Sequence, residues 1–169
     1  MVCYYCGQRM MAEAACEAGH YVCDGCHEAD HVEFIKRFCR FSEETEPLAL
    51  FGKMREAHLF PLHGPEHHAL VPAAFLTAYN NLHGSLPAAR IEAAIDRGAG
   101  LPGGTCAYWG GCAAALGAGI AYATILRATP LSTEPRRVVQ AVVSEILSRM
   151  AGYSAARCCR RESYIALTA

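Results

Sequence analysis

The chain has 169 residues, enough for one domain with a substantial hydrophobic core or for a domain with a small appendage. Hydrophobic residues make up 53% of the sequence and charged residues 18%, and this composition excludes an intrinsically disordered protein. The net charge of -1 gives no general case for binding nucleic acid or a membrane surface.

The first ten residues, MVCYYCGQRM, lack the charged region and apolar run of a secretory signal, so we expect a cytoplasmic location. Disulfides are rare in that reducing compartment. The ten cysteines are therefore better explained by metal binding or redox chemistry than by a disulfide framework.

Residues 1–30 are predicted to form a small zinc-ribbon-like unit. Two Cys-x2-Cys knuckles, Cys3 with Cys6 and Cys23 with Cys26, have the spacing at which four thiolates surround one tetrahedral zinc ion. Such a short unit buries little apolar area, so we expect zinc to supply much of its folding energy. Rubredoxin-like iron is the alternative metal, and a nearby histidine could replace one cysteine.

Residues 31–169 are predicted to be an all-α domain, because apolar residues recur at intervals of three and four and no alternating strand pattern is found. Proline, threonine and glutamate at helix starts, and glycine at helix ends, indicate a bundle of about six or seven helices with short connections. The predicted helices begin near residue 28, at 47, near 65, at 87, near 111, near 134 and near 156.

One predicted helix contains an uncharged run of twenty residues, from Ala107 to Leu126. That length can span a bilayer, but half of the residues are glycine or alanine. We expect a buried, tightly packed helix, in which Gly117 and Gly119 allow neighbouring helices to approach closely.

Three histidines surround the predicted helix start near residue 65, in the sequence HGPEHH. His63 and His67 are four residues apart and can share one helical face, and His68 follows directly. Glu66 could orient an imidazole or act as a base. Helix capping and surface solvation are the structural alternatives for these histidines.

Four cysteines lie in two further motifs. Cys106 and Cys112 belong to the glycine-rich sequence GTCAYWGGC, which leads into a helix start where amide N–H groups are expected to lower thiol pKa values. Cys158 and Cys159 lie between arginines in ARCCRRES. Because helical neighbours point about 100 degrees apart, we expect only one of this adjacent pair to face a shared site.

These motifs, with the leading CYYCG and CDGCH, resemble the uncharacterised cysteine-rich domain-of-unknown-function family DUF5714, seen alone or fused to radical-SAM or methyltransferase modules. The resemblance implies one composite site. Its expected catalytic residues are Cys106, Cys112, Cys158 and Cys159, and its expected cofactor-binding residues are His63, His67, His68, Arg157 and Arg160.

The residue types permit three kinds of site: an iron-sulfur cluster, a mixed Cys/His site for zinc or another metal, and a redox-active thiol pair activated by arginines. We expect a cysteine-based metal or redox protein that works with a radical-SAM or methyltransferase protein. The rival is a noncatalytic zinc-ribbon module that binds nucleic acid or a protein partner.

Overall fold

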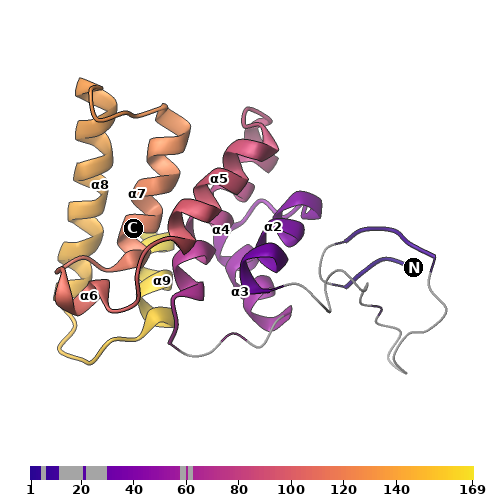
Figure 1. Cartoon of the computed structure of the whole chain (residues 1–169), viewed down its shortest axis with the longest axis horizontal. Helices are drawn as coiled ribbons and strands as arrows, with labels where there is room; N and C mark the ends of the chain where they lie inside the picture. Colours follow the sequence, from indigo (N-terminus) through magenta and orange to yellow (C-terminus); the bar gives the residue numbers. More distant parts are fainter. Residues whose placement is uncertain (5–6, 12–20, 22–29, 58–59, 61–62) are drawn as a thin grey trace.

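The computed structural model describes residues 1–4, 7–11, 21, 30–57, 60 and 63–169 (Figure 1). Within them the chain forms eight α-helices and two isolated β-bridges, and no strand. The predicted all-α body is confirmed. The helices are α2 (His31–Phe41), α3 (Pro47–Ala57), α4 (Glu66–His83), α5 (Ala88–Ala99), α6 (Thr105–Tyr108), α7 (Ala113–Leu126), α8 (Thr133–Ala151) and α9 (Cys159–Thr168).

Local sequence signals set several helix ends. The side chain of Asp30 accepts a hydrogen bond from the backbone N–H of Glu33 and caps α2. Pro47 occupies the first position of α3, where its missing N–H is no loss. Gly84 ends α4 with a φ of 61°, a conformation that favours glycine.

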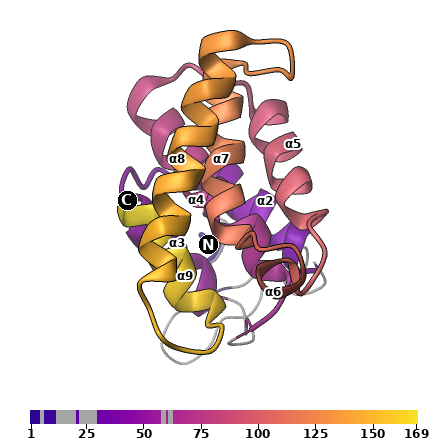
Figure 2. The ribbon, with the colours of Figure 1, turned by 90° about the vertical axis from the view of Figure 1, so that its left-hand side faces the viewer.

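Helix α4 is the centre of the bundle. It packs against α2, α3, α5, α7 and α9, while α7 also packs against α8 and α9. Figures 1 and 2 show α7 and α8 side by side, with the short α6 at one end of the pair next to the start of α9.

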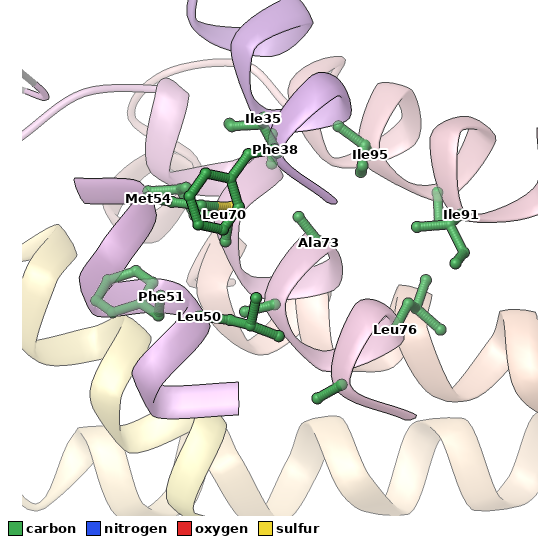
Figure 3. Packing of buried hydrophobic residues seen from close by; sticks show 14 of the residues in the cluster. Ile35, Phe38, Leu50, Phe51, Met54, Leu70, Ala73, Leu76, Ile91 and Ile95 are labelled. Carbon is green, nitrogen blue, oxygen red and sulfur yellow. The ribbon is translucent and has the colours of Figure 1, made fainter. Parts of the chain in front are cut away.

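The main hydrophobic core lies between α2, α3, α4 and α5 (Figure 3). Fully burying one side chain of this size contributes about 1.5–3 kcal/mol, so the core dominates the stability of the bundle. A second cluster joins α4, α7, α8 and α9. Completely buried members of the main core include Phe34, Ile35, Leu50, Phe51, Met54, Leu70, Leu76 and Ile95.

The glycines of α7 allow the close helix contacts that the sequence predicts. A Cβ atom at Gly117 would lie 3.1 Å from the side chain of Val71 on α4. At Gly119 it would lie 2.5 Å from Val143 on α8. None of the helices in the described part of the chain is long and apolar enough to cross a membrane.

Helix α4 contains a proline, Pro72, in its interior. Proline has no N–H, so the carbonyl of His68, four residues earlier, loses its hydrogen bond within the helix. Gly98 on α5 faces this carbonyl so closely that a Cβ atom there would lie 2.5 Å from its oxygen. The α4–α5 contact therefore depends on glycine at the position that adjoins His68.

Of the four predicted zinc ligands, only Cys3 lies in the described residues, where it is buried. Its carbonyl accepts a hydrogen bond of 2.9 Å from the N–H of Gly7, whose φ of 70° favours glycine. Cys6, Cys23 and Cys26 lie outside the described residues. The zinc-ribbon-like unit therefore stays a prediction.

Candidate functional site

A pocket of about 760 Å³ is lined by residues of α4, α6, α7, α8 and the start of α9. Figure 2 shows α6 and the start of α9 at the same end of the bundle. Three sequence motifs, far apart along the chain, contribute to it. Its lining includes His63, His67 and His68 before and within α4, Cys106 and Cys112 on the α6–α7 segment, and Arg157, Cys159, Arg161, Glu162 and Ser163 around the start of α9.

The segment between Cys106 and Cys112 folds back on itself, and both cysteines line the pocket. The carbonyl of Thr105 accepts hydrogen bonds from the N–H groups of Trp109, at 3.1 Å, and Gly111, at 3.3 Å. The backbones of Thr105 and Gly111 are thus in contact. Cys106 directly follows the first of these residues, and Cys112 directly follows the second. Cys106 is exposed and Cys112 is half-buried.

Burial raises the pKa of the Cys112 thiol, which is the N-cap residue of α7. The amide groups of Ala114 and Ala115 act in the opposite direction but are outweighed, and the negative charges of Glu162 and Cys106 raise the pKa further. The pKa of the Cys112 thiol is therefore raised, whereas the sequence predicts that it is lowered. Desolvation outweighs the two amide groups because the half-buried thiol is packed at the helix start.

The adjacent cysteines Cys158 and Cys159 face different surroundings. Cys159, the first residue of α9, lines the large pocket. Cys158 is the N-cap residue, and its sulfur accepts a hydrogen bond of 3.5 Å from the N–H of Arg161. It lines a smaller, adjoining pocket together with Arg160. The structure therefore brings Cys159 and Arg157 to the large pocket, but places Cys158 and Arg160 beside it.

The three histidines differ in burial and in their contacts. His67 is 1% exposed and lies near the rings of Phe51 and Phe60, at centroid distances of 6.4 Å. His63 is exposed. His68 donates the hydrogen of Nδ1 to the carbonyl of Leu101 at 2.9 Å, because a carbonyl can only accept.

That hydrogen bond fixes the tautomer of His68 and leaves Nε2 as the basic nitrogen. Burial lowers the pKa of His68, with a further decrease from the charge of Arg157. His68 is therefore a neutral, oriented imidazole, able to accept a proton or a metal ion at Nε2.

Glu162 is a pocket residue that the sequence analysis missed. It is 9% exposed, and its Oε1 accepts hydrogen bonds from Arg161. Its Oε2 is buried and has no hydrogen-bond partner among the described residues. In the sequence it is one glutamate beside two arginines, a pattern typical of a surface ion pair, so only the folded chain shows that it faces the pocket.

The pocket does not hold a ready-made metal site. Among the residues that the structure describes, no three or more His, Cys, Asp and Glu side chains lie together as a metal ion requires. The thiols and imidazoles share one pocket, but a cluster or ion bound by several of them would require side-chain movement.

Comparison with known proteins gives one match. A family model described as "Family of unknown function (DUF5714)" matches residues 35–169. Neither the curated proteins nor the solved structures contain a match to the chain. The pocket lies wholly within the matched residues.

Proposed function

Because the chain belongs to the family of unknown function DUF5714, its activity has to come from its own site, and we propose that the large pocket is a thiol redox site. One observation carries this proposal: Cys106, Cys112 and Cys159 line the same pocket as three histidines. Cys106 is the attacking thiol because it is exposed, and Cys112 is the second thiol because the folded segment turns back toward Cys106 and both line this pocket.

The proposed reaction is thiol–disulfide exchange. The Cys106 thiolate attacks one sulfur of a substrate disulfide, and the other sulfur leaves as a thiolate that takes up the proton lost by Cys106. The Cys112 thiolate then attacks the Cys106 sulfur, and the second substrate sulfur leaves and takes up the proton lost by Cys112. Two electrons pass to the substrate, which becomes two thiols, while Cys106 and Cys112 become a disulfide.

His68 is the residue that can hold a proton in this reaction. It is neutral, and because its Nδ1 donates to the carbonyl of Leu101, its Nε2 is the nitrogen that can act as a base. As the resemblance implies, the electrons would serve a radical-SAM or methyltransferase partner.

A metal centre on the same residues, iron-sulfur or mononuclear, is the second candidate. It is favoured by His68, because histidine ligands characteristically donate their other ring N–H to a backbone carbonyl. The donors do not converge as they stand, so this candidate requires the thiols to move on binding.

The experiment uses the full chain, purified without oxygen and treated with oxidised glutathione, followed by peptide mapping of blocked thiols. We expect a Cys106–Cys112 disulfide. Cys112→Ser should stop the reaction at a glutathione mixed disulfide on Cys106, because the second thiol is absent. Cys39→Ser is the matched control, since Cys39 on α2 is half-buried against the main core, outside the pocket lining, and its substitution should leave the product unchanged.

Oxidation that spares both Cys106 and Cys112 would contradict the exchange reaction. Iron, zinc and acid-labile sulfide are measured on the same wild-type protein and on Cys159→Ser. Iron and sulfide that disappear with Cys159 would support the metal centre instead. If neither result appears, the rival function, a zinc-ribbon module that binds a nucleic acid or a protein, is favoured.

A further inference from the structure

The smaller pocket, of about 470 Å³, adjoins the large one along α9. The two share Tyr153 and Arg161. The described residues that line the smaller pocket include Cys158, Arg160 and Tyr164 and no acidic side chain. The charged side chains of this lining are therefore the two arginines, Arg160 and Arg161, and Arg161 is paired with Glu162 outside the lining.

Two arginines from different helices flank one aromatic pair, of which Tyr164 lines this pocket. The rings of Phe51 on α3 and Tyr164 on α9 meet edge to face, with centroids 5.2 Å apart. The guanidinium of Arg55 lies 5.8 Å from the Phe51 ring, and that of Arg160 lies 5.8 Å from the Tyr164 ring. Cation–π contacts of this kind hold both guanidiniums at the α3–α9 contact.

Neither of these arginines has an ion-pair partner among the described residues, whereas four other arginines do. Arg40, Arg137, Arg149 and Arg161 are each paired with a glutamate. The Nε atom of Arg55 is buried and lacks a hydrogen-bond acceptor among the described residues. A buried donor without an acceptor is costly, so the described residues leave part of the hydrogen-bonding capacity of Arg55 unmet.

The electrostatics agree with this interpretation. Burial lowers the pKa of Arg55, and the positive charge of Arg160 lowers it further. The repulsion by Arg160 outweighs the attraction by Glu56, the neighbouring carboxylate. A bound anion would relieve the repulsion between the two arginines.

We propose that Arg55 and Arg160 bind a small tetrahedral oxyanion, a phosphate group, beside Cys158. A guanidinium presents its N–H groups as a fork that matches two oxygens of a phosphate, and two such forks from different helices would hold the anion firmly. The proposal is independent of the thiol chemistry in the large pocket, because neither arginine lines that pocket.

The test is isothermal titration calorimetry of the full chain with sodium phosphate at constant ionic strength. We expect saturable binding of phosphate that sodium chloride does not reproduce. Arg160→Gln and Arg55→Gln should each weaken binding about tenfold or more, because each removes a charge-assisted fork. Arg136→Gln, an exposed arginine of α8, is the matched control and should leave the affinity unchanged.

Arg160 is exposed, so its substitution keeps the test valid if Arg55→Gln impairs folding. Arg160→Lys should recover only part of the affinity, because lysine keeps the charge and loses the fork. No binding to the wild type, or an equal loss in the Arg136 control, would overturn the site. Titration with ADP identifies the source of the phosphate: tighter binding than inorganic phosphate assigns a nucleotide, and weaker binding assigns the free ion.

Discussion

The cysteine thiols of this protein differ in pKa and in accessibility because they are buried to different extents. Burial raises the pKa of Cys39 to about 12, and it also raises the pKa of Cys112. Cys106 is exposed. Since only the thiolate is nucleophilic, accessibility and protonation together should rank the reactivity of these three residues.

We therefore expect iodoacetamide to modify Cys106 first, Cys112 only at a pH above the ordinary thiol value of about 8.5, and Cys39 only on unfolding. Peptide mass spectrometry across a pH series measures each rate. Glu162→Gln should shift the Cys112 profile to lower pH, because the Glu162 charge contributes to the raised pKa. Glu145→Gln, in a surface ion pair of α8, is the matched control. Equal rates for Cys106 and Cys112 at neutral pH would be inconsistent with these environments.

His68 should make stability depend on pH. Its pKa is lowered in the folded chain, so the unfolded chain binds more protons below the unfolded value of about 6.5. The stability contributed by the neutral imidazole is complete above that value and is lost as the pH falls toward and through the lowered folded pKa. Urea unfolding at a series of pH values measures this loss.

His68→Asn is the informative variant, because an asparagine amide can still donate to the carbonyl of Leu101 but does not titrate. We expect a smaller decrease in the free energy of unfolding between about pH 7 and pH 5 than in the wild type. His63→Asn, at an exposed position, should retain the full decrease. An unchanged pH dependence in His68→Asn would assign the effect to other groups.

At the scale of the helices, the local sequence predicts a helix end correctly where proline or glycine marks it. The starts of α3 and α4 and the end of α4 at Gly84 follow the sequence prediction. The one-turn helix α6 was not predicted, because four residues carry no periodicity. The raised pKa of Cys112 was also missed, since the sequence shows a helix start but not the packing around it.

Two glycines give a matched pair of substitutions: Gly98 lies in the tight α4–α5 contact, and Gly52 on α3 has open space around it. Gly98→Ala places a Cβ against the carbonyl of His68 and should destabilise the chain by about 1–3 kcal/mol, as overpacking does. Gly52→Ala, where a Cβ meets nothing within 4 Å, should stabilise α3 by roughly 0.5–1 kcal/mol. Urea unfolding followed by circular dichroism measures both. Equal effects of the two substitutions would contradict the close approach at Gly98.

For the whole molecule, the sequence predicted which residue types line the pocket, but not which residues of distant helices pack beside them. The three motifs that line it are visible as cysteine and histidine clusters. Arg55 was not singled out, because it lies about a hundred positions before Arg160 and only the packing of α3 on α9 relates them. Cys158 and Cys159 are adjacent in sequence, yet the start of α9 separates their surroundings.

The predicted zinc-ribbon-like unit and the helical body should respond separately to loss of metal. We expect one zinc atom per chain in the wild type, and Cys3→Ser should lower the zinc content because it removes one of four thiolates. Far-UV circular dichroism should remain helical, since all of the described helices begin at His31 or later. Cys39→Ser is the control. Loss of both zinc and helix in Cys3→Ser would show that the body depends on the metal.

The proline inside α4 has a mechanical consequence. A helix resists bending through its regular hydrogen bonds, and Pro72 removes the one that would restrain the carbonyl of His68. The first turn of α4, which carries His67 and His68, is therefore joined to the rest of the helix by one backbone hydrogen bond fewer. Bending of α4 at this turn, which lies at the wall of the large pocket, therefore breaks one hydrogen bond fewer than bending at a regular turn would.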